Sequence, residues 1–346
     1  MNLNKFEIRR QEAVEGKSYS AVLVFSGDFK QWCEDFFYLT GKRIDGSILI
    51  LRKGKPSILL TSRMNVAEGK KAGMKTLIYD KKNPLERVGR YLKGIKNIGI
   101  NYSFVSYAQY RKIRLKLRKK KILDCGRNIL LQRMIKDREE IQKIRKAQRI
   151  TRDIINWVGR LIYSGMREDE VKQRILKRTI EFGCTPAFLP IVASGTSSAS
   201  PHYSGGKKRL SGVVLIDYGV RYEGYCGDMT RCFFLDECKK EREVYSKLQK
   251  ISNEVIVNIK EGMEVRKLDL LHTKLMKKYN LPEPIHLLGH GIGLDVHELP
   301  SIHVRAKEKI YAGEVFTIEP GAYFPGKFGV RYEDVIYFDG KKANVL

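Results

Sequence analysis

Short apolar runs alternate with helix-like segments along the first 125 or so residues, a pattern typical of an α/β unit. The predicted strands are Ala21–Phe25, Ser47–Leu51, Ser57–Leu60, Thr76–Tyr79 and Ile98–Asn101, and the predicted helices are Met64–Ala72, Pro84–Leu92 and Ser106–Arg118. Gly54-Lys55-Pro56 separates two of the apolar runs and predicts a hairpin turn. No histidine falls in this part of the chain. We therefore expect it to shape or dimerise the protein, or to close over a substrate.

A second pattern begins after a boundary that we place at Cys125–Lys136, giving predicted domains of residues 1–126 and 127–346. Two long amphipathic helices are followed by apolar strands, and this order then occurs again. The predicted elements are helices Asp137–Val158 and Arg167–Phe182 with strands over 187–235, then helices Lys239–Ile259 and Val265–Tyr279 with strands over 285–338. Asp137 is a suitable N-cap for the first helix. The pattern predicts an internally duplicated α+β domain with its helices packed on one sheet face.

The first predicted hairpin of this domain, within residues 212–230, carries two acidic residues. Residues directly opposite each other in an unbulged hairpin have a constant sum of residue numbers. A turn centred between Tyr222 and Glu223 sets that sum to 445, which pairs Asp217 with Asp228. The two side chains would then lie on one face with Cβ atoms about 5 Å apart, where like charges repel.

The second hairpin repeats the arrangement. A turn centred near Gly326 pairs Glu319 with Glu333, and these residues lie 102 and 105 positions after the first pair. Acidic residues are common, and a β-bulge in either hairpin would spoil the pairing. Two such pairs in matching places of an internal repeat nevertheless indicate a cation between them.

Histidine supplies the remaining candidate ligand. All six histidines lie beyond residue 200, and His290 is surrounded by glycines in Gly289-His290-Gly291-Ile292-Gly293, which lets the backbone approach a bound group closely. Four carboxylates and one imidazole suit two divalent ions used for hydrolysis. Manganese or cobalt is the first expectation, with zinc or iron as alternatives. Thr230 and Arg331 lie two residues from a carboxylate, on the same strand face, and are candidate supporting residues. For His272, His286 and His303 we favour hydrogen-bonded loop histidines.

Composition adds an unusual charge. The chain has 66 Lys and Arg against 39 Asp and Glu, a formal net charge of +27. The densest basic run, residues 111–121, has apolar residues at helical spacing, so we interpret it as a helix with a solvated basic face, and nucleic-acid binding is the less favoured alternative. The six cysteines are widely spread and indicate reduced, buried thiols. We find no membrane span and no signal-peptide core, and expect a cytoplasmic protein.

The motifs of the second half, in their order, resemble a metallopeptidase family that includes methionine aminopeptidase, Xaa-Pro aminopeptidase and prolidase. The resemblance covers nearly all of residues 130–340. It is most specific at Ile191-Val192-Ala193-Ser194-Gly195, Pro201-His202-Tyr203, Ile216-Asp217-Tyr218-Gly219, Gly227-Asp228-Met229-Thr230-Arg231, Gly289-His290-Gly291-Ile292-Gly293, Val296-His297-Glu298, Thr317-Ile318-Glu319-Pro320-Gly321 and Val330-Arg331-Tyr332-Glu333-Asp334. Gly227 departs from the family, which more often has serine there. Phe37-Tyr38-Leu39-Thr40-Gly41 is similar to the small N-terminal domain of the Xaa-Pro branch.

The resemblance implies a pseudo-symmetric pita-bread catalytic domain after a creatinase-like α/β domain. It implies a centre of two metal ions with five ligands, of which Asp228 and Glu333 would bridge the ions; the full set is Asp217, Asp228, His290, Glu319 and Glu333. His202 and His297 would contact the substrate carbonyl and the tetrahedral intermediate, and Glu319 would also transfer a proton. A homodimer is implied as well.

The implied activity is hydrolysis of the Xaa-Pro bond in dipeptides or at the N-terminus of peptides, by attack of a metal-activated hydroxide. The choice between dipeptidase and aminopeptidase stays open. One alternative is a non-catalytic relative that binds nucleic acid or protein, which the charge of +27 favours. Another is an aminopeptidase of the methionine type.

Overall fold

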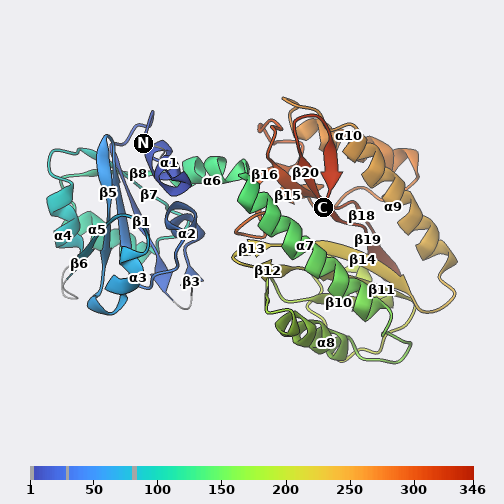
Figure 1. Ribbon diagram of the computed structural model, residues 1–346. Coiled ribbons are helices and arrows are strands. Elements are labelled where there is room, and N and C mark those ends of the chain that lie inside the picture. Colours follow the sequence, from blue (N-terminus) through green and yellow to red (C-terminus); the bar gives the residue numbers. More distant parts are fainter. Residues whose placement is uncertain (1–3, 29–30, 80–83) are drawn as a thin grey trace. The chain divides into compact units, whose positions relative to one another are not determined.

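The computed structural model describes residues 4–28, 31–79 and 84–346, and the chain divides into two compact units, Met1–Arg133 and Met134–Leu346 (Figure 1). The division falls inside the predicted boundary segment, seven residues beyond the predicted end of the first domain at residue 126. Helix α6 (Gly126–Met134) ends at this point.

The N-terminal unit contains a six-stranded mixed sheet in the order β6-β5-β4-β1-β7-β8. Its strands are β1 (Ala21–Phe25), β4 (Ile48–Arg52), β5 (Lys55–Thr61), β6 (Lys75–Ile78), β7 (Asn97–Ile100) and β8 (Lys121–Asp124). The five predicted strands are confirmed, whereas β8, which begins at the last lysine of the basic run, was not predicted. The hairpin between β4 and β5 turns at Lys53 and Gly54, and Pro56 already lies in β5. Gly54 has φ of 62°, which explains the glycine. A short ribbon of β2 (Gly27–Asp28) and β3 (Gln31–Trp32) lies apart from the sheet.

Helices cover this sheet where apolar spacing predicted them, with shorter bounds. The predicted segment 64–72 becomes η1 (Arg63–Asn65) and α3 (Val66–Lys70), and the other two predictions correspond to α4 (Pro84–Tyr91) and α5 (Tyr107–Lys116). Helix α5 starts with a capping box at Ser106 and buries Ile113, so the predicted helix with one buried face is confirmed. Helices α1 (Lys5–Glu12) and α2 (Glu34–Thr40) were not predicted.

The C-terminal unit repeats the order helix, helix, strands, as predicted. Its helices are α7 (Arg138–Gly159), α8 (Glu168–Glu181), α9 (Lys239–Val257) and α10 (Arg266–Lys278). Asp137 caps α7 in a full capping box with Glu140: the Asp137 side chain accepts from the Glu140 N–H, and the Glu140 side chain accepts from the Asp137 N–H.

The strands after the first helix pair are β9 (Thr185–Pro186), β10 (Ile191–Ser194), β11 (Val213–Tyr218), β12 (Val220–Tyr222), β13 (Tyr225–Cys226) and β14 (Met229–Phe234), with the short helix η2 (Gly195–Ala199) after β10. Those after the second pair are β15 (Gly289–Gly291), β16 (Glu298–Ile302), β17 (Val315–Ile318), β18 (Gly321–Phe324), β19 (Phe328–Arg331), β20 (Asp334–Phe338) and β21 (Ala343–Val345). They form the sheets β10-β11-β14, β13-β12-β9, β16-β15-β17-β20-β21 and β18-β19.

Strand β11 contributes to two hydrophobic cores. Val214 and Ile216 pack into the core formed with α7 and α8, whereas Val213 and Leu215 pack into the core that contains α9 and α10. Because side chains alternate along a strand, Asp217 shares the face of Val213 and Leu215 and points toward the second half of the domain.

The predicted pairing of Asp217 with Asp228 is wrong by two residues. Strands β11 and β14 pair Asp217 with Thr230, and the turn residues are Glu223 and Gly224, both with positive φ. A two-residue loop with positive φ at both positions matches the twist of a β-hairpin better than the turn that we assumed. Since the shift is an even number, Asp228 stays on the same face as Asp217.

The second hairpin has the predicted register. Ile318 pairs with Asp334 in one ladder and Gly321 pairs with Arg331 in the next, so Glu319 and Glu333 occupy opposite positions between the two ladders. The predicted centre at Gly326 is confirmed, and Gly326 has φ of 71°.

All six cysteines are buried free thiols, as predicted. Among the helices of the described residues, none combines the length and apolarity that crossing a bilayer requires.

Candidate metal centre

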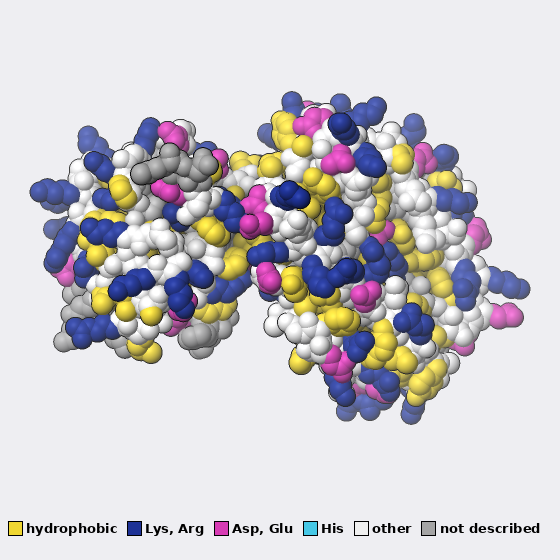
Figure 2. Space-filling view, in the orientation of Figure 1, with side chains coloured by type: hydrophobic (Ala, Val, Ile, Leu, Met, Phe, Trp, Pro, Cys, Tyr) yellow, Lys and Arg dark blue, Asp and Glu magenta, His cyan; other side chains and the backbone are white. Residues whose placement is uncertain are grey.

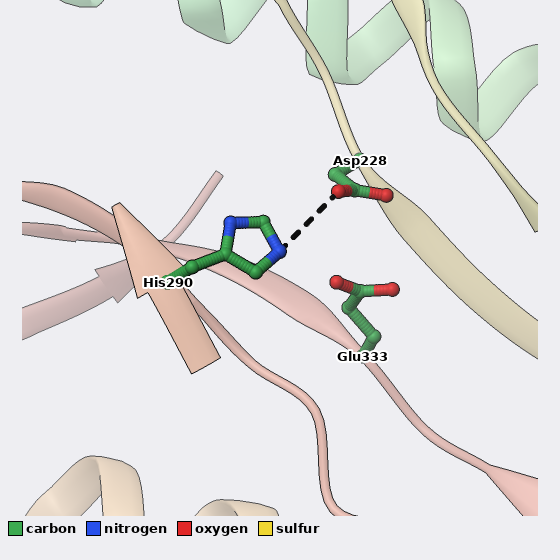
Figure 3. Close-up of side chains that lie close together, drawn as sticks. All are labelled: Asp228, His290 and Glu333. Carbon is green, nitrogen blue, oxygen red and sulfur yellow. Dashed lines mark ion pairs between the residues drawn. The ribbon is translucent and has the colours of Figure 1, made fainter. Parts of the chain in front are cut away.

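The two hairpins and strand β15 bring acidic side chains and one imidazole together. Asp228, His290 and Glu333 are buried and offer ligand atoms that all lie within 4.8 Å of one another (Figure 3). The His290 Nε2 atom lies 3.7 Å from Asp228 Oδ2 and 3.5 Å from Glu319 Oε1. Asp217 joins the group through Arg331, whose Nη2 contacts Asp217 Oδ2. All five predicted ligands therefore gather at one place.

His290 is oriented for a ligand role. Its Nδ1 lies 3.1 Å from the carbonyl oxygen of Gly291, and because a carbonyl only accepts, Nδ1 carries the proton. Nε2 then presents a lone pair toward the carboxylates. Burial, reinforced by neighbouring His297, lowers the pKa of His290 to about 3, so the ring is neutral near pH 7. A neutral imidazole with its second nitrogen fixed by a carbonyl is the usual form of a histidine metal ligand.

The carboxylates strongly resist being charged together. Burial is the main cause that raises the pKa of Asp228 and of Glu333 well above the usual range, and the neighbouring carboxylates raise both further. Burial also raises the pKa of Glu319 to about 7. Arg331 opposes these shifts, but one guanidinium does not balance the whole group.

Two features of these residues fit divalent ions: the kinds of donor atom, and two carboxylate oxygens without a hydrogen-bond partner among the described residues. Asp217 Oδ1 and Asp228 Oδ1 are buried and, within the described part of the chain, have no hydrogen-bond partner. Buried polar atoms are normally satisfied, so two unpartnered carboxylate oxygens on one face of the first hairpin are consistent with a bound cation. Oxygen donors with one imidazole nitrogen suit manganese, cobalt, iron or zinc.

Thr230 and Arg331 support the carboxylates, as their spacing suggested. The Thr230 hydroxyl donates to Glu333 Oε2 at 2.6 Å and accepts from Arg331 Nε at 3.0 Å. Arg331 also donates from Nη1 to the hydroxyl of Tyr323 at 2.9 Å. Every one of these contacts is buried, so the two carboxylate pairs are held in a fixed relation.

Gln148 and Tyr323 are supporting residues that the sequence reading missed. Gln148 on α7 accepts from the Asp228 N–H at 2.9 Å and donates to the Asp228 carbonyl at 2.8 Å, which fixes the backbone at Asp228. A glutamine on the apolar face of a predicted amphipathic helix was the available signal. Tyr323 contacts both Arg331 and, through its hydroxyl, His286 Nε2 at 3.0 Å.

His297 and His202 lie close to the centre. The ring of His297 lies 4.2 Å from that of His290, measured between centroids, in an edge-on arrangement. Burial lowers the pKa of His297, the Asp217 carboxylate counteracts this, and nearby His202 lowers it further. His202 follows η2 in a turn and is exposed.

Glu168 fixes the loop that carries His202, another feature that the sequence did not reveal. Its buried carboxylate accepts from the Ser194 N–H at 3.1 Å, just before the loop, and interacts with Tyr203, next to His202. The start of α8 therefore contacts the chain on both sides of His202.

The three remaining histidines differ in their hydrogen bonding. His286 contacts the Leu287 carbonyl at 2.7 Å through Nδ1, and His303 accepts from the Arg305 N–H at 3.1 Å, so both are hydrogen-bonded loop histidines as predicted. The prediction for His272 is wrong, because it lies within α10. Its ring is buried, and neither ring nitrogen has a hydrogen-bond partner among the described residues.

Two hairpins that converge on a buried N/O ligand set, within a duplicated α+β domain, define a metallohydrolase. Residues 142–339 match metallopeptidase family M24, and residues 8–135 match the creatinase/prolidase N-terminal domain. The chain belongs to metallopeptidase family M24.

Similar proteins support this assignment over most of the chain. An uncharacterized peptidase of Methanocaldococcus jannaschii is 37% identical over 216 residues, which are 59% of this chain and 60% of that protein. The Xaa-Pro dipeptidase of Pyrococcus furiosus is 31% identical over 315 residues, 90% of each chain.

Solved structures share the fold. A recombinant prolidase from Thermococcus sibiricus superposes with a TM-score of 0.88 at 29% identity and covers 100% of this chain and 97% of its own. An X-Pro aminopeptidase from Thermotoga maritima gives 0.85 at 27% identity, covering 94% and 95%. The expected creatinase-like N-terminal domain and pita-bread catalytic domain are thereby confirmed.

Proposed function

We propose that this chain is a metal-dependent peptidase that cleaves the bond between an N-terminal residue and a following proline. The observation that carries the proposal is the buried group of carboxylates around the neutral imidazole of His290. Two divalent ions would be held by Asp217, Asp228, His290, Glu319 and Glu333, and Asp228 and Glu333 would serve both ions. The names of the relatives supply the substrate class.

The chemistry divides between the ions and the chain. Bound divalent ions would lower the pKa of a water molecule and polarise the scissile carbonyl. Glu319, at the edge of the group, accepts a proton and returns it to the leaving nitrogen, which for proline must be protonated as the bond breaks. His202 and His297 donate hydrogen bonds to the oxyanion, and losing one such donor typically costs about two to three orders of magnitude in rate.

The proposal also covers the identity of the metal, the oligomeric state and the location in the cell. The ligand set contains no thiolate and suits manganese, cobalt, zinc or iron, and of these we infer manganese or cobalt as the first choice. A homodimer and a cytoplasmic location are the expectations drawn from the sequence and from the resemblance.

The test measures hydrolysis and metal content together. The chain loaded with manganese, and then with cobalt, is assayed on an Xaa-Pro dipeptide and on a longer Xaa-Pro-Yaa peptide, which separates dipeptidase from aminopeptidase. EDTA should abolish release of the first residue, and Asp228→Ala should lose both metal and activity. Asp153→Ala, which removes an exposed carboxylate from α7, is the matched control and should keep both. Hydrolysis that persists in a demonstrably metal-free sample would contradict the mechanism.

A separate observation favours the alternative, a relative that binds nucleic acid. Lys and Arg side chains lie over both units on the face shown in Figure 2. A chain that takes up no metal but shifts nucleic acid in a salt-sensitive way would favour that alternative. Preference for Met-Ala over Met-Pro peptides would instead indicate the methionine type of aminopeptidase.

A further inference from the structure

A hollow of about 480 Å³ lies in the N-terminal unit, between α1, the hairpin of β4 and β5, and the start of β6. This volume falls in the range of small-molecule sites in proteins. The lining carries five cationic side chains from three separate stretches of chain: Arg10, Arg52, Lys53, Lys55 and Lys75. Two acidic residues, Glu7 and Glu15, also line it, so the charged lining has an excess of cations.

Arg10 is the unusual member of this lining. Its side chain is only 4% exposed, and its guanidinium donates from Nη1 to the Leu39 carbonyl at 3.1 Å. Its Nε is buried without a hydrogen-bond partner, and among the described residues no carboxylate lies within ion-pair distance of it. Burial lowers the pKa of Arg10, and Glu7 counteracts this only in part. Charged side chains are almost never buried unless they are paired.

The other four cations are also left without an ion pair among the described residues. Arg52 donates to the Pro56 carbonyl at 3.1 Å, and its Nε is buried without a partner, as in Arg10. The same unit pairs comparable residues elsewhere, since Arg133 contacts Asp35 at 2.7 Å and Arg43 contacts Glu34 at 2.6 Å. Arg10 and Arg52 therefore differ from Arg133 and Arg43 in having no carboxylate partner among the described residues.

We propose that this hollow binds a small anion carrying phosphate, through Arg10 and Arg52 at its wall and the three lysines at its rim. Guanidinium groups match phosphate oxygens with paired N–H donors, and flexible lysines add charge from several directions. The hollow is large enough for a nucleotide as well as for pyrophosphate. It lies wholly within the N-terminal unit, so this site is independent of the proposed peptidase centre.

The experiment titrates the full-length chain with pyrophosphate by isothermal calorimetry, with and without EDTA. Phosphates also bind metal ions, so the signal from the hollow is the part that survives EDTA. Lys53→Gln with Lys75→Gln removes two rim charges. Lys116→Gln with Lys119→Gln removes the same charge from exposed positions in and after α5 of the same unit and is the matched control. Arg10→Met removes the buried charge.

We expect one pyrophosphate per chain, binding at least tenfold more weakly to the rim variant and to Arg10→Met, and changed less than twofold in the control. Tighter binding of ADP than of pyrophosphate would identify a nucleotide as the occupant, and equal binding would identify the phosphate group alone. Arg10→Met should keep the thermal midpoint of the wild type, because it removes an uncompensated buried cation. Equal weakening in the rim and control variants, or complete loss of binding with EDTA, would overturn the proposal.

Discussion

Glu314 is a buried carboxylate outside the candidate metal centre. It should make the stability of the C-terminal unit, which is the catalytic unit, depend on pH. Its side chain is 0% exposed, and the residue lies just before β17. One carboxylate oxygen accepts from the Tyr311 N–H at 3.0 Å, and the other is buried without a hydrogen-bond partner among the described residues. Burial raises the pKa of Glu314 from 4.5 to about 8, Glu261 and Glu308 raise it further, and nearby Lys136 lowers it.

The sign of the effect follows from the raised pKa. Between pH 4.5 and pH 8 the folded chain keeps a proton on Glu314 that the unfolded chain loses, so the free energy of unfolding falls as pH rises. Below pH 4.5 both states are protonated and the cost vanishes. These two pKa values give a cost of about 1 kcal/mol at pH 5, about 3 kcal/mol at pH 7 and about 4 kcal/mol at pH 8.

Glu314→Gln should remove this cost, because the amide has the shape of the protonated acid and its carbonyl still accepts from Tyr311. The measurement is urea unfolding of both proteins in EDTA from pH 5 to pH 8, followed by tryptophan fluorescence, to which Trp157 on α7 contributes beside Trp32. The variant should gain stability over the wild type as pH rises, by about 3 kcal/mol across this range. Glu237→Gln, which removes an exposed carboxylate, should show no such trend.

A gain that is the same at pH 5 and pH 8 would show that Glu314 is charged throughout and that the reasoning is wrong. Loss of stability at pH 7 would show instead that the attraction to Lys136 outweighs burial. The carboxylates of the metal centre also titrate, but they do so in both proteins and cancel in the difference.

Three further substitutions test the supports of the site and of its leading helix. Thr230→Val removes the hydroxyl that donates to Glu333 at 2.6 Å, and the affinity for manganese measured by calorimetry should fall by about tenfold or more. Asp137→Ala removes the side-chain cap of α7 and should cost about 1 kcal/mol in urea unfolding, measured beside a substitution at an exposed site of the same helix. Gly227→Ala places a Cβ 3.0 Å from the Ala147 backbone, which should lower the free energy of unfolding by about 1–3 kcal/mol. An unchanged thermal midpoint would show that α7 can shift to accommodate the methyl group at no cost in stability.

The sequence predicted the layout of the catalytic unit because its signals are local. Helical spacing, a cap at Asp137 and the glycine at Gly326 each act within a few residues, and each is found where it was predicted. The pairing of Asp217 failed because a hairpin register depends on the backbone conformation of two turn residues, and Glu223 gives no sign in the sequence that it adopts positive φ.

Supporting residues were hard to predict for a different reason. Gln148 meets Asp228 across 80 positions of chain, and Glu168 reaches the loop of His202 from another helix. The local sequence pattern predicts that a buried polar side chain needs a hydrogen-bond partner. It does not predict which residue that partner is. The departure at Gly227 is explained by the structure, since α7 passes so close that a serine side chain would meet Thr151.

The position of the proposed ligands across the duplication has a consequence for folding. Asp217 and Asp228 come from the first half of the catalytic unit, and His290, Glu319 and Glu333 come from the second, so neither half holds the complete set. Packing these halves together gathers carboxylates whose mutual repulsion and burial oppose the folded state, as their raised pKa values show. A cation that binds only the assembled set recovers that cost, and its binding free energy is then folding free energy as well. Metal should therefore stabilise the catalytic unit most at high pH, where the carboxylates are charged. In the absence of a bound cation, the contacts from Thr230 and Arg331 hold the carboxylates together.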